Sequence, residues 1–130
     1  MSSYTVDAYG WIEYLDGTKK GELVKKIVEN TENKIYTSSV TYAEVISKFI
    51  RTQKDPLVAN DAIHALSKIT SPNAQIAFLA AKIHAENRER KPDFGLADAF
   101  VIATAKVLST KIITGDLKHF SDVPNTILLK

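Results

Sequence analysis

The chain contains no cysteine, few glycines and prolines, and no long apolar segment. The absence of cysteine excludes a disulfide framework and any zinc site built on thiolates. The glycines form neither a G-x-G-x-x-G motif nor a phosphate-binding loop, which argues against a nucleotide cofactor. No segment approaches the roughly 20 apolar residues of a membrane-spanning helix, and the start of the chain lacks the features of an export signal. We therefore expect a soluble, cytoplasmic protein that does not contact a membrane.

The composition that remains is typical of one globular domain. Of the 130 residues, 45% are hydrophobic and 25% are charged, and the sequence has no repeats or linker-like stretches. We therefore predict a single domain over residues 1–130. The formal charge of +2 is too small to indicate a nucleic-acid-binding protein by itself.

Short β-prone segments alternate along the chain with longer segments of helical periodicity. Strands separated by helices imply right-handed crossovers, which place the strands parallel and the helices on both faces of the sheet. We predict an α/β fold with three α/β/α layers and a mainly parallel central sheet of four to five strands. The expected strands are 4–6, 34–37, 112–114 and 126–129, and the expected helices are 8–15, 22–29, 40–51, 58–69, 74–90 and 95–108. The helices 58–69 and 74–90 are expected to pack as a hairpin.

Asp98 is the one charged residue in the otherwise apolar stretch GLADAFVIATA. Val101, Ile102 and Ala105 share its helix face, so we expect this face to lie in the core. Burial of an ionised carboxylate costs far more than the roughly 0.3 to 1 kcal/mol that a helix dipole returns. The fold must therefore supply a cation, a set of hydrogen-bond donors or a raised pKa.

Three further acids occupy positions where parallel sheets bind ligands. Asp7 follows the first strand, Asp116 follows the penultimate strand, and Glu44 lies in the first turns of the helix after the second strand. Carboxylates that share one cleft repel each other unless a cation joins them. Hard oxygen ligands without cysteine or paired histidines suit Mg²⁺ or Mn²⁺, and such an ion activates water for phosphodiester hydrolysis.

Each of these acids also has a structural explanation. Asp7 is placed to cap the helix that follows it, and Asp116 is placed to close an Asx turn. The segment 41–44 fits a capping box, and Glu44 precedes Lys48 by the spacing of a helical ion pair. Taken alone, Glu44 fits the structural explanation better.

At these acids the sequence resembles the PIN-domain nucleases, and among them the VapC-like ribonuclease toxins of prokaryotic toxin–antitoxin pairs. The resemblance covers nearly the whole chain and is carried by YTVDAYGWIEYL, IYTSSVTYAEV, GLADAFVIATA and IITGDLKHF. One difference is that Ala8 and Tyr9 follow Asp7, where many relatives have a serine or threonine.

The resemblance implies a compact α/β/α fold and an endoribonuclease that cleaves single-stranded RNA as the toxin of a type II toxin–antitoxin system. It implies that one or two Mg²⁺ or Mn²⁺ ions are held by a catalytic quartet of Asp7, Glu44, Asp98 and Asp116. Thr114 matches a hydroxyl that helps to order the site in the family. A homodimer and a cognate antitoxin protein are also implied.

Other side chains near the quartet have two explanations each. Lys48 and Arg51 project from the same side of their helix as Glu44, where they either contact RNA phosphates or form an ordinary solvated face. His119 follows Asp116 by three residues, and we favour an ordinary loop histidine over a substrate contact. We expect the core or a dimer surface, rather than base-stacking platforms, for three aromatic residues: Tyr9, Trp11 and Tyr14.

Two other functions compete with RNA cleavage. Phosphoryl-transfer domains of the receiver and phosphatase types need paired acids or a D-x-D motif after the first strand, and Asp7-Ala8-Tyr9 has neither. The stronger alternative is a catalytically weak PIN-fold module that binds proteins through its dimer or antitoxin surface. The presence of all four acids favours the enzyme.

Overall fold

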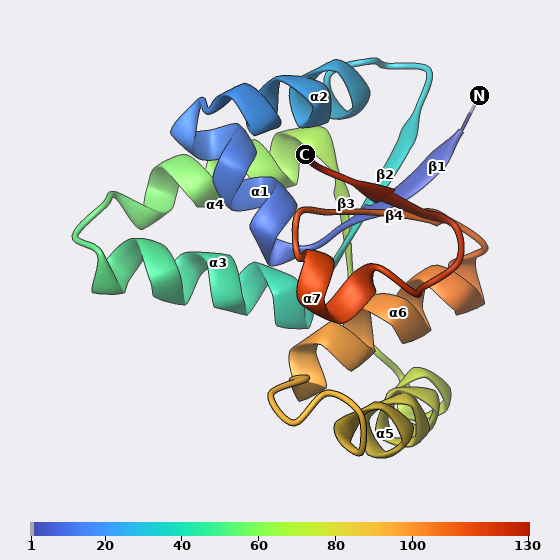
Figure 1. Ribbon diagram of the computed structural model, residues 1–130. Helices are drawn as coiled ribbons and strands as arrows, with labels where there is room; N and C mark the ends of the chain where they lie inside the picture. The colour runs from blue at the N-terminus through green and yellow to red at the C-terminus, as the bar shows by residue number, and fades with distance from the viewer. Residues whose placement is uncertain (1) are drawn as a thin grey trace.

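The computed structural model describes residues 2–130 and contains a five-stranded sheet in the order β3-β2-β1-β4-β5 (Figure 1). Each neighbouring pair of strands in it is parallel. The α/β class and the parallel sheet predicted from the sequence are therefore confirmed. The strands are β1 (Ser3–Val6), β2 (Lys34–Ser38), β3 (Lys68–Thr70), β4 (Lys111–Thr114) and β5 (Thr126–Leu128).

Helices cover both faces of the sheet, which confirms the three layers. One face carries α1 (Ala8–Asp16), α2 (Lys19–Val28), α3 (Ser39–Arg51) and α4 (Pro56–Leu66). The other face carries α6 (Leu96–Leu108), with α5 (Ala74–Arg88) packed along its outer side. The short helix α7 (Leu117–Phe120) follows β4. Within residues 2–130, no helix combines the length and the apolar character needed to span a bilayer.

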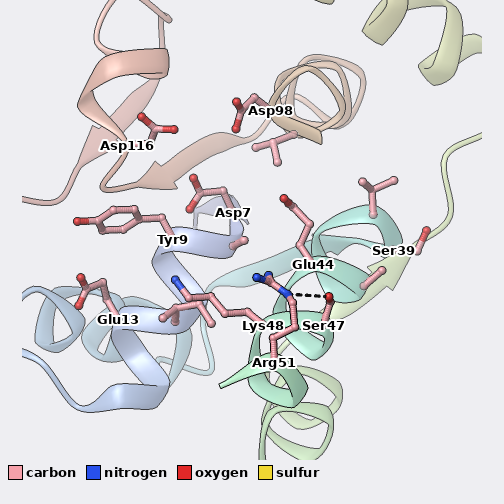
Figure 2. Close-up of a pocket in the computed structure, with 15 residues that line it drawn as sticks. Asp7, Tyr9, Glu13, Ser39, Glu44, Ser47, Lys48, Arg51, Asp98 and Asp116 are labelled. Carbon is pink, nitrogen blue, oxygen red and sulfur yellow. Dashed lines mark hydrogen bonds between the residues drawn. The ribbon is translucent and has the colours of Figure 1, made fainter. Parts of the chain in front are cut away.

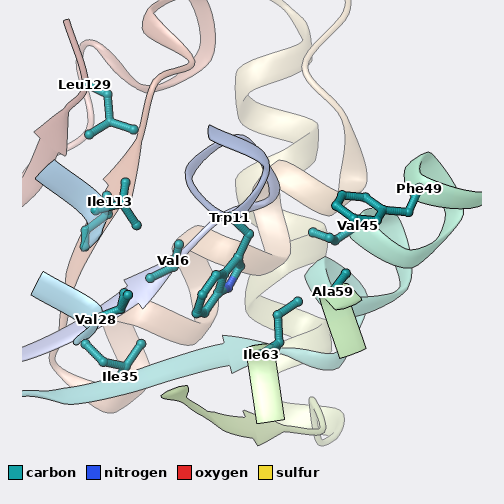
Figure 3. Packing of buried hydrophobic residues seen from close by; sticks show 11 residues of the cluster. Val6, Trp11, Val28, Ile35, Val45, Phe49, Ala59, Ile63, Ile113 and Leu129 are labelled. Carbon is teal, nitrogen blue, oxygen red and sulfur yellow. The ribbon is translucent and has the colours of Figure 1, made fainter. Parts of the chain in front are cut away.

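Each face of the sheet has its own hydrophobic core. Trp11 is fully buried on the first face, where Val6 and Ile113 from the strands and Val45 from α3 pack in the same cluster (Figure 3). The indole N–H of Trp11 donates to the hydroxyl of Thr37, 3.0 Å away, which pairs its only polar atom. The core position predicted for Trp11 is therefore confirmed.

The predicted helix 58–69 is wrong in its last residues. Helix α4 ends at Leu66, and residues 68–70 form the edge strand β3, which pairs with β2. The hydroxyl of Ser67 donates to the carbonyl of Ile63 at 2.7 Å and contacts the Thr37 hydroxyl at 2.8 Å. The chain leaves the helix here because β2 offers an open edge to the β-branched residues that follow.

The predicted hairpin between the helices 58–69 and 74–90 is also wrong. Helix α4 packs against α3 on the first face of the sheet, whereas α5 packs against α6 on the second face. Strand β3 separates the two helices and carries the chain from one face to the other. Periodicity identifies an apolar helix face, but it does not say which layer covers that face.

The strand order places β1 and β4 side by side in the middle of the sheet. The chain builds outward from β1 to β2 and β3 on one side, and from β4 to β5 on the other. The point between β1 and β4 is the topological switch point, where parallel sheets bind ligands at the carboxyl ends of the strands. The residues after these two strands therefore define the candidate site.

Candidate metal centre and substrate cleft

Asp7 lies directly after β1 at the switch point and is 6% exposed. Its carboxylate caps α1 by accepting the backbone N–H of Gly10 at 2.8 Å. A side chain at position 10 would come within 2.9 Å of Val6, so the tight turn from strand to helix requires glycine there. The cap predicted as the structural explanation of Asp7 thus exists, and it holds the carboxylate at the site.

Burial raises the pKa of Asp7 to about 7. Hydrogen bonds from the Thr114 hydroxyl and the Gly10 backbone lower the pKa, but they are outweighed, and the nearby charges of Asp98 and Asp116 raise it further. A carboxylate in this position ionises fully at neutral pH only when a cation joins it. This is the electrostatic environment expected of a metal ligand.

Asp116 lies after β4, the neighbour of β1 in the sheet. Its carboxylate caps α7 and accepts the backbone N–H of His119 at 3.1 Å. The backbone N–H of Asp116 in turn donates to the hydroxyl of Thr114, 2.9 Å away. Thr114 is fully buried and hydrogen-bonds to both Asp7 and Asp116, so it joins the ends of β1 and β4.

Asp98 enters the site from the first turn of α6. Its carboxylate accepts the backbone N–H of Gly95 at 3.1 Å, in a capping box at the start of that helix. The side chain is 25% exposed, so the expectation that its whole face lies in the core is wrong. Val101 and Ile102 are buried on the adjoining turn, whereas Asp98 reaches the edge of the cleft. Burial raises the pKa of Asp98, while the Gly95 N–H and His119 lower it.

Glu44 faces this group of acids from α3, on the opposite wall of the cleft (Figure 2). Partial desolvation and the charge of Asp98 raise its pKa, although the side chain is open to solvent. The predicted capping box over 41–44 is wrong, because α3 starts earlier and the Ser38 hydroxyl caps it through the N–H of Val40. Among the described residues, Glu44 forms no ion pair with Lys48.

These side chains line one cleft with a volume of about 890 Å³ (Figure 2). The structure brings to it the four predicted acids, Asp7, Glu44, Asp98 and Asp116, and both predicted cations, Lys48 and Arg51. Figure 2 shows the two cations on α3 below Glu44, on the side of the cleft away from Asp116. The cleft therefore has an acidic end and a basic wall.

His119 is the residue whose position the sequence analysis judged wrongly, because it lies in α7 beside the acids and not in an ordinary loop. Its Nδ1 lies 2.8 Å from the carboxylate of Asp116 and 3.0 Å from that of Asp98, and its Nε2 lies 3.3 Å from Asp93. The side chain is only 13% exposed, so it is not an ordinary loop histidine. The spacing from Asp116 was a usable signal, but the contact with Asp98 depends on two segments that are distant in the sequence.

Tyr9 does not lie in the core, which was one of its two expected places. Its ring lines the cleft, is 37% exposed and packs against Gly115, where any side chain would overlap the ring. Tyr14 is partly buried, and its hydroxyl donates to Glu29 at 2.7 Å. Of the two tyrosines, only Tyr9 presents an aromatic surface to the candidate site.

The chain matches the model of the PIN domain family over residues 4–125, and it belongs to this family. The resemblance identified from the sequence is thereby confirmed. PIN domains usually use divalent metals and act as nucleases. Among proteins with curated descriptions, none is similar enough in sequence to count as a match.

Solved structures with the same fold come from several bacteria. A VapBC2 complex of Rickettsia felis bound to a promoter DNA fragment superposes with a TM-score of 0.75 at 18% identity, over 97% of this chain and 96% of that chain. VapBC-1 of nontypeable Haemophilus influenzae has a TM-score of 0.72 and 22% identity, over 98% of both chains. VapC20 of Mycobacterium tuberculosis, a toxin that cleaves the sarcin–ricin loop, has a TM-score of 0.70 and 15% identity, over 85% of this chain and 86% of that chain. At these identities the similarity establishes the fold.

The residues present fit a divalent cation. Asp98, Asp116 and His119 each offer a ligand atom, and these atoms lie within 4.8 Å of one another. Asp7 and Glu44 stand outside this tight group but line the same cleft. The buried Asp7, with its raised pKa, further favours a positive charge at this position.

Proposed function

We propose that this protein is a metal-dependent endoribonuclease that cleaves single-stranded RNA and acts as the toxin of a type II toxin–antitoxin pair. One observation carries the proposal: Asp7, Glu44, Asp98 and Asp116 come from four separate parts of the chain and line one cleft at the switch point of the sheet. Helix capping alone does not require these acids to lie in the same cleft.

The proposed ion is Mg²⁺ or Mn²⁺, with Asp7, Asp98, Asp116 and Glu44 as the ligand set. When bound, such an ion lowers the pKa of a coordinated water and stabilises negative charge on phosphate oxygens. The protein orients the ligands through backbone donors: Gly10 holds Asp7, Gly95 holds Asp98, and the N–H of His119 holds Asp116. Because these donors belong to helix starts, the carboxylates are positioned before any ion arrives.

The proposed substrate-binding wall consists of Lys48, Arg51 and Tyr9. Lys48 and Arg51 are exposed on successive turns of α3 and lie within reach of phosphates that enter the cleft. Tyr9 offers a ring face on which an unpaired base can stack, as single-stranded nucleic acids require. We expect modest affinity that decreases with salt, because the contacts are few and largely electrostatic.

The proposed protein partners are a cognate antitoxin and a second copy of the chain. Similar structures, from R. felis and H. influenzae, contain toxin–antitoxin complexes. In this chain, Ile50, Leu57 and Val58 are between 55% and 64% exposed at the end of α3 and the start of α4. Exposed apolar side chains at one connection between two helices favour a protein contact. Light scattering coupled to size-exclusion chromatography tests the dimer directly.

Cleavage of a labelled single-stranded RNA tests the enzymatic proposal. We expect cleavage with Mg²⁺ or Mn²⁺, none after chelation, and a loss of at least about 100-fold in Asp7→Asn and Asp116→Asn. The matched control is Asp61→Asn, which removes an exposed acid of α4 that hydrogen-bonds only to Asn60 among the described residues. Cleavage that persists in both site variants rejects the assignment. A folded protein that binds an antitoxin but cleaves no RNA supports the alternative of a protein-binding module.

A further inference from the structure

His119 offers the acidic site a nitrogen atom. Its Nδ1 lies 2.8 Å from Oδ2 of Asp116 and 3.0 Å from Oδ2 of Asp98. In an octahedral shell with bonds of about 2.1 Å, adjacent ligand atoms are separated by about 3.0 Å. The nitrogen therefore stands at the spacing of an adjacent ligand from each of the two carboxylates, and the three residues offer ligand atoms within 4.8 Å of one another.

The surroundings of His119 hold its ring in this orientation. Nε2 lies 3.3 Å from Oδ1 of Asp93, whose other oxygen accepts from Lys118 at 2.5 Å. The ring also packs edge-on against Phe94, with 5.7 Å between ring centroids. In the ion-free structure Nδ1 hydrogen-bonds to the carboxylate of Asp116 at 2.8 Å. A metal ion would replace the proton on Nδ1, while a proton on Nε2 directed at Asp93 keeps the ring in this orientation. Metal-binding histidines commonly have such a carboxylate behind them.

We propose that His119 binds the metal ion of the site through Nδ1, and that the site therefore prefers a first-row transition ion, Mn²⁺, to Mg²⁺. The inference rests on the cation site of the proposed function and names a ligand outside the acidic quartet. Mg²⁺ strongly favours oxygen ligands, whereas imidazole nitrogen binds first-row transition ions more readily. Sequence reasoning led to an all-oxygen shell because the chain has no paired histidines, but one histidine on α7 is enough to change the donor set.

The direct test is electron paramagnetic resonance of the full chain loaded with Mn²⁺. Pulsed measurements detect the nuclear coupling of a nitrogen bonded to the ion. We expect this coupling in the unmodified protein and its loss in His119→Gln. The matched control is His64→Gln on α4, where the ring contacts the carbonyl of Asn60, and the coupling should persist there.

Metal affinity gives a second readout. Titration of the metal-free protein should show Mn²⁺ affinity about 10-fold or more lower in His119→Gln, with Mg²⁺ affinity changed less than about threefold. Thermal melting of the metal-free variants checks that each is folded. If His119→Gln does not fold, the nitrogen signal of the unmodified protein still decides the question.

Two results would overturn the inference, and they differ in what else they reject. Mn²⁺ bound without nitrogen coupling removes His119 from the ligand set, while RNA cleavage that still depends on Asp116 keeps the proposed function. An unmodified protein that binds no Mn²⁺ at millimolar concentration rejects the cation site, and the proposed function fails with it.

Discussion

The hydroxyl of Thr114 accepts the backbone N–H of Asp116 at 2.9 Å. The same hydroxyl hydrogen-bonds to the carboxylate of Asp7 and lowers its pKa. A single buried side chain thus connects the acids that follow β1 and β4. This contact places the two carboxylates relative to each other without the contribution of a metal ion.

Thr114→Val tests this connection because it preserves the volume of the side chain and removes the hydroxyl. We expect RNA cleavage to decrease by about 10- to 100-fold, as is typical when a group that orients a metal ligand is removed. The matched control is Thr104→Val in α6, whose buried hydroxyl has no partner among the described residues. Loss of this hydroxyl should leave RNA cleavage unchanged and should change the free energy of unfolding by less than about 1 kcal/mol. Equal activity in both variants would refute the role of Thr114.

The metal-free protein should lose stability as the pH rises toward neutrality. The pKa of Asp7 is about 7 in the folded protein, against an ordinary value of 3.8. Between these values the folded state retains a proton that the unfolded chain has lost. The stabilisation that protonated Asp7 adds to the free energy of unfolding is therefore complete below pH 3.8 and is lost as the pH rises through about 7.

Denaturant unfolding in the presence of a chelator measures this effect. The free energy of unfolding of the unmodified protein should fall, relative to Asp7→Asn, by up to about 1.4 kcal/mol per pH unit between the two pKa values. Above pH 8 the free energies of unfolding of the unmodified protein and of Asp7→Asn should change with pH in parallel. A constant difference between them from pH 4 to pH 8 would show that Asp7 does not hold a proton in the folded protein.

Lys48 and Arg51 should bind RNA through its phosphates. In the inactive Asp116→Asn background, Lys48→Gln and Arg51→Gln should weaken the binding of unrelated RNA sequences to a similar extent. Each should also reduce the slope of the logarithm of the binding constant against the logarithm of the salt concentration by about one. Lys82→Gln, on the exposed side of α5, is the control. Unchanged salt dependence in both α3 variants would indicate an ordinary solvated helix face.

Tyr9 should bind an unpaired base by stacking. Tyr9→Leu should weaken RNA binding by about 1–3 kcal/mol, whereas Tyr9→Phe should retain it because the ring remains. Phe78→Leu provides a control on α5, where the ring is 71% exposed. Quenching of a fluorescent base analogue in the bound RNA reports the stacking itself. Equal quenching with leucine and tyrosine would contradict it.

Much of the fold could be predicted because its signals are local. The apolar spacing of residues 40–51 and 95–108 identified α3 and α6, and the short β-prone segments gave four of the five strands. The fifth, β3, was missed because residues 68–70 become a strand only by pairing with β2. A three-residue edge strand carries little signal of its own, and the apolar period of the preceding helix extends into it.

The candidate site was partly predictable for a similar reason. Asp7 and Asp116 follow strands, and parallel strands bring their carboxyl ends to one edge of the sheet whatever the details of packing. No comparable rule places His119 and Tyr9 at the site. Their positions depend on how α7 and α1 pack against segments that are remote in the sequence.

The sequence by itself determined the order of four strands and six helices, the positions of the acids beside those elements, and the family that this order indicates. These features follow from periodicity and turn chemistry, which act between near neighbours. Only the tertiary structure decided that α4 and α5 lie on opposite faces, that Asp98 is partly exposed, and that His119 joins Asp98 and Asp116. Such relationships arise from packing and hydrogen bonding between distant segments, and no local pattern encodes them.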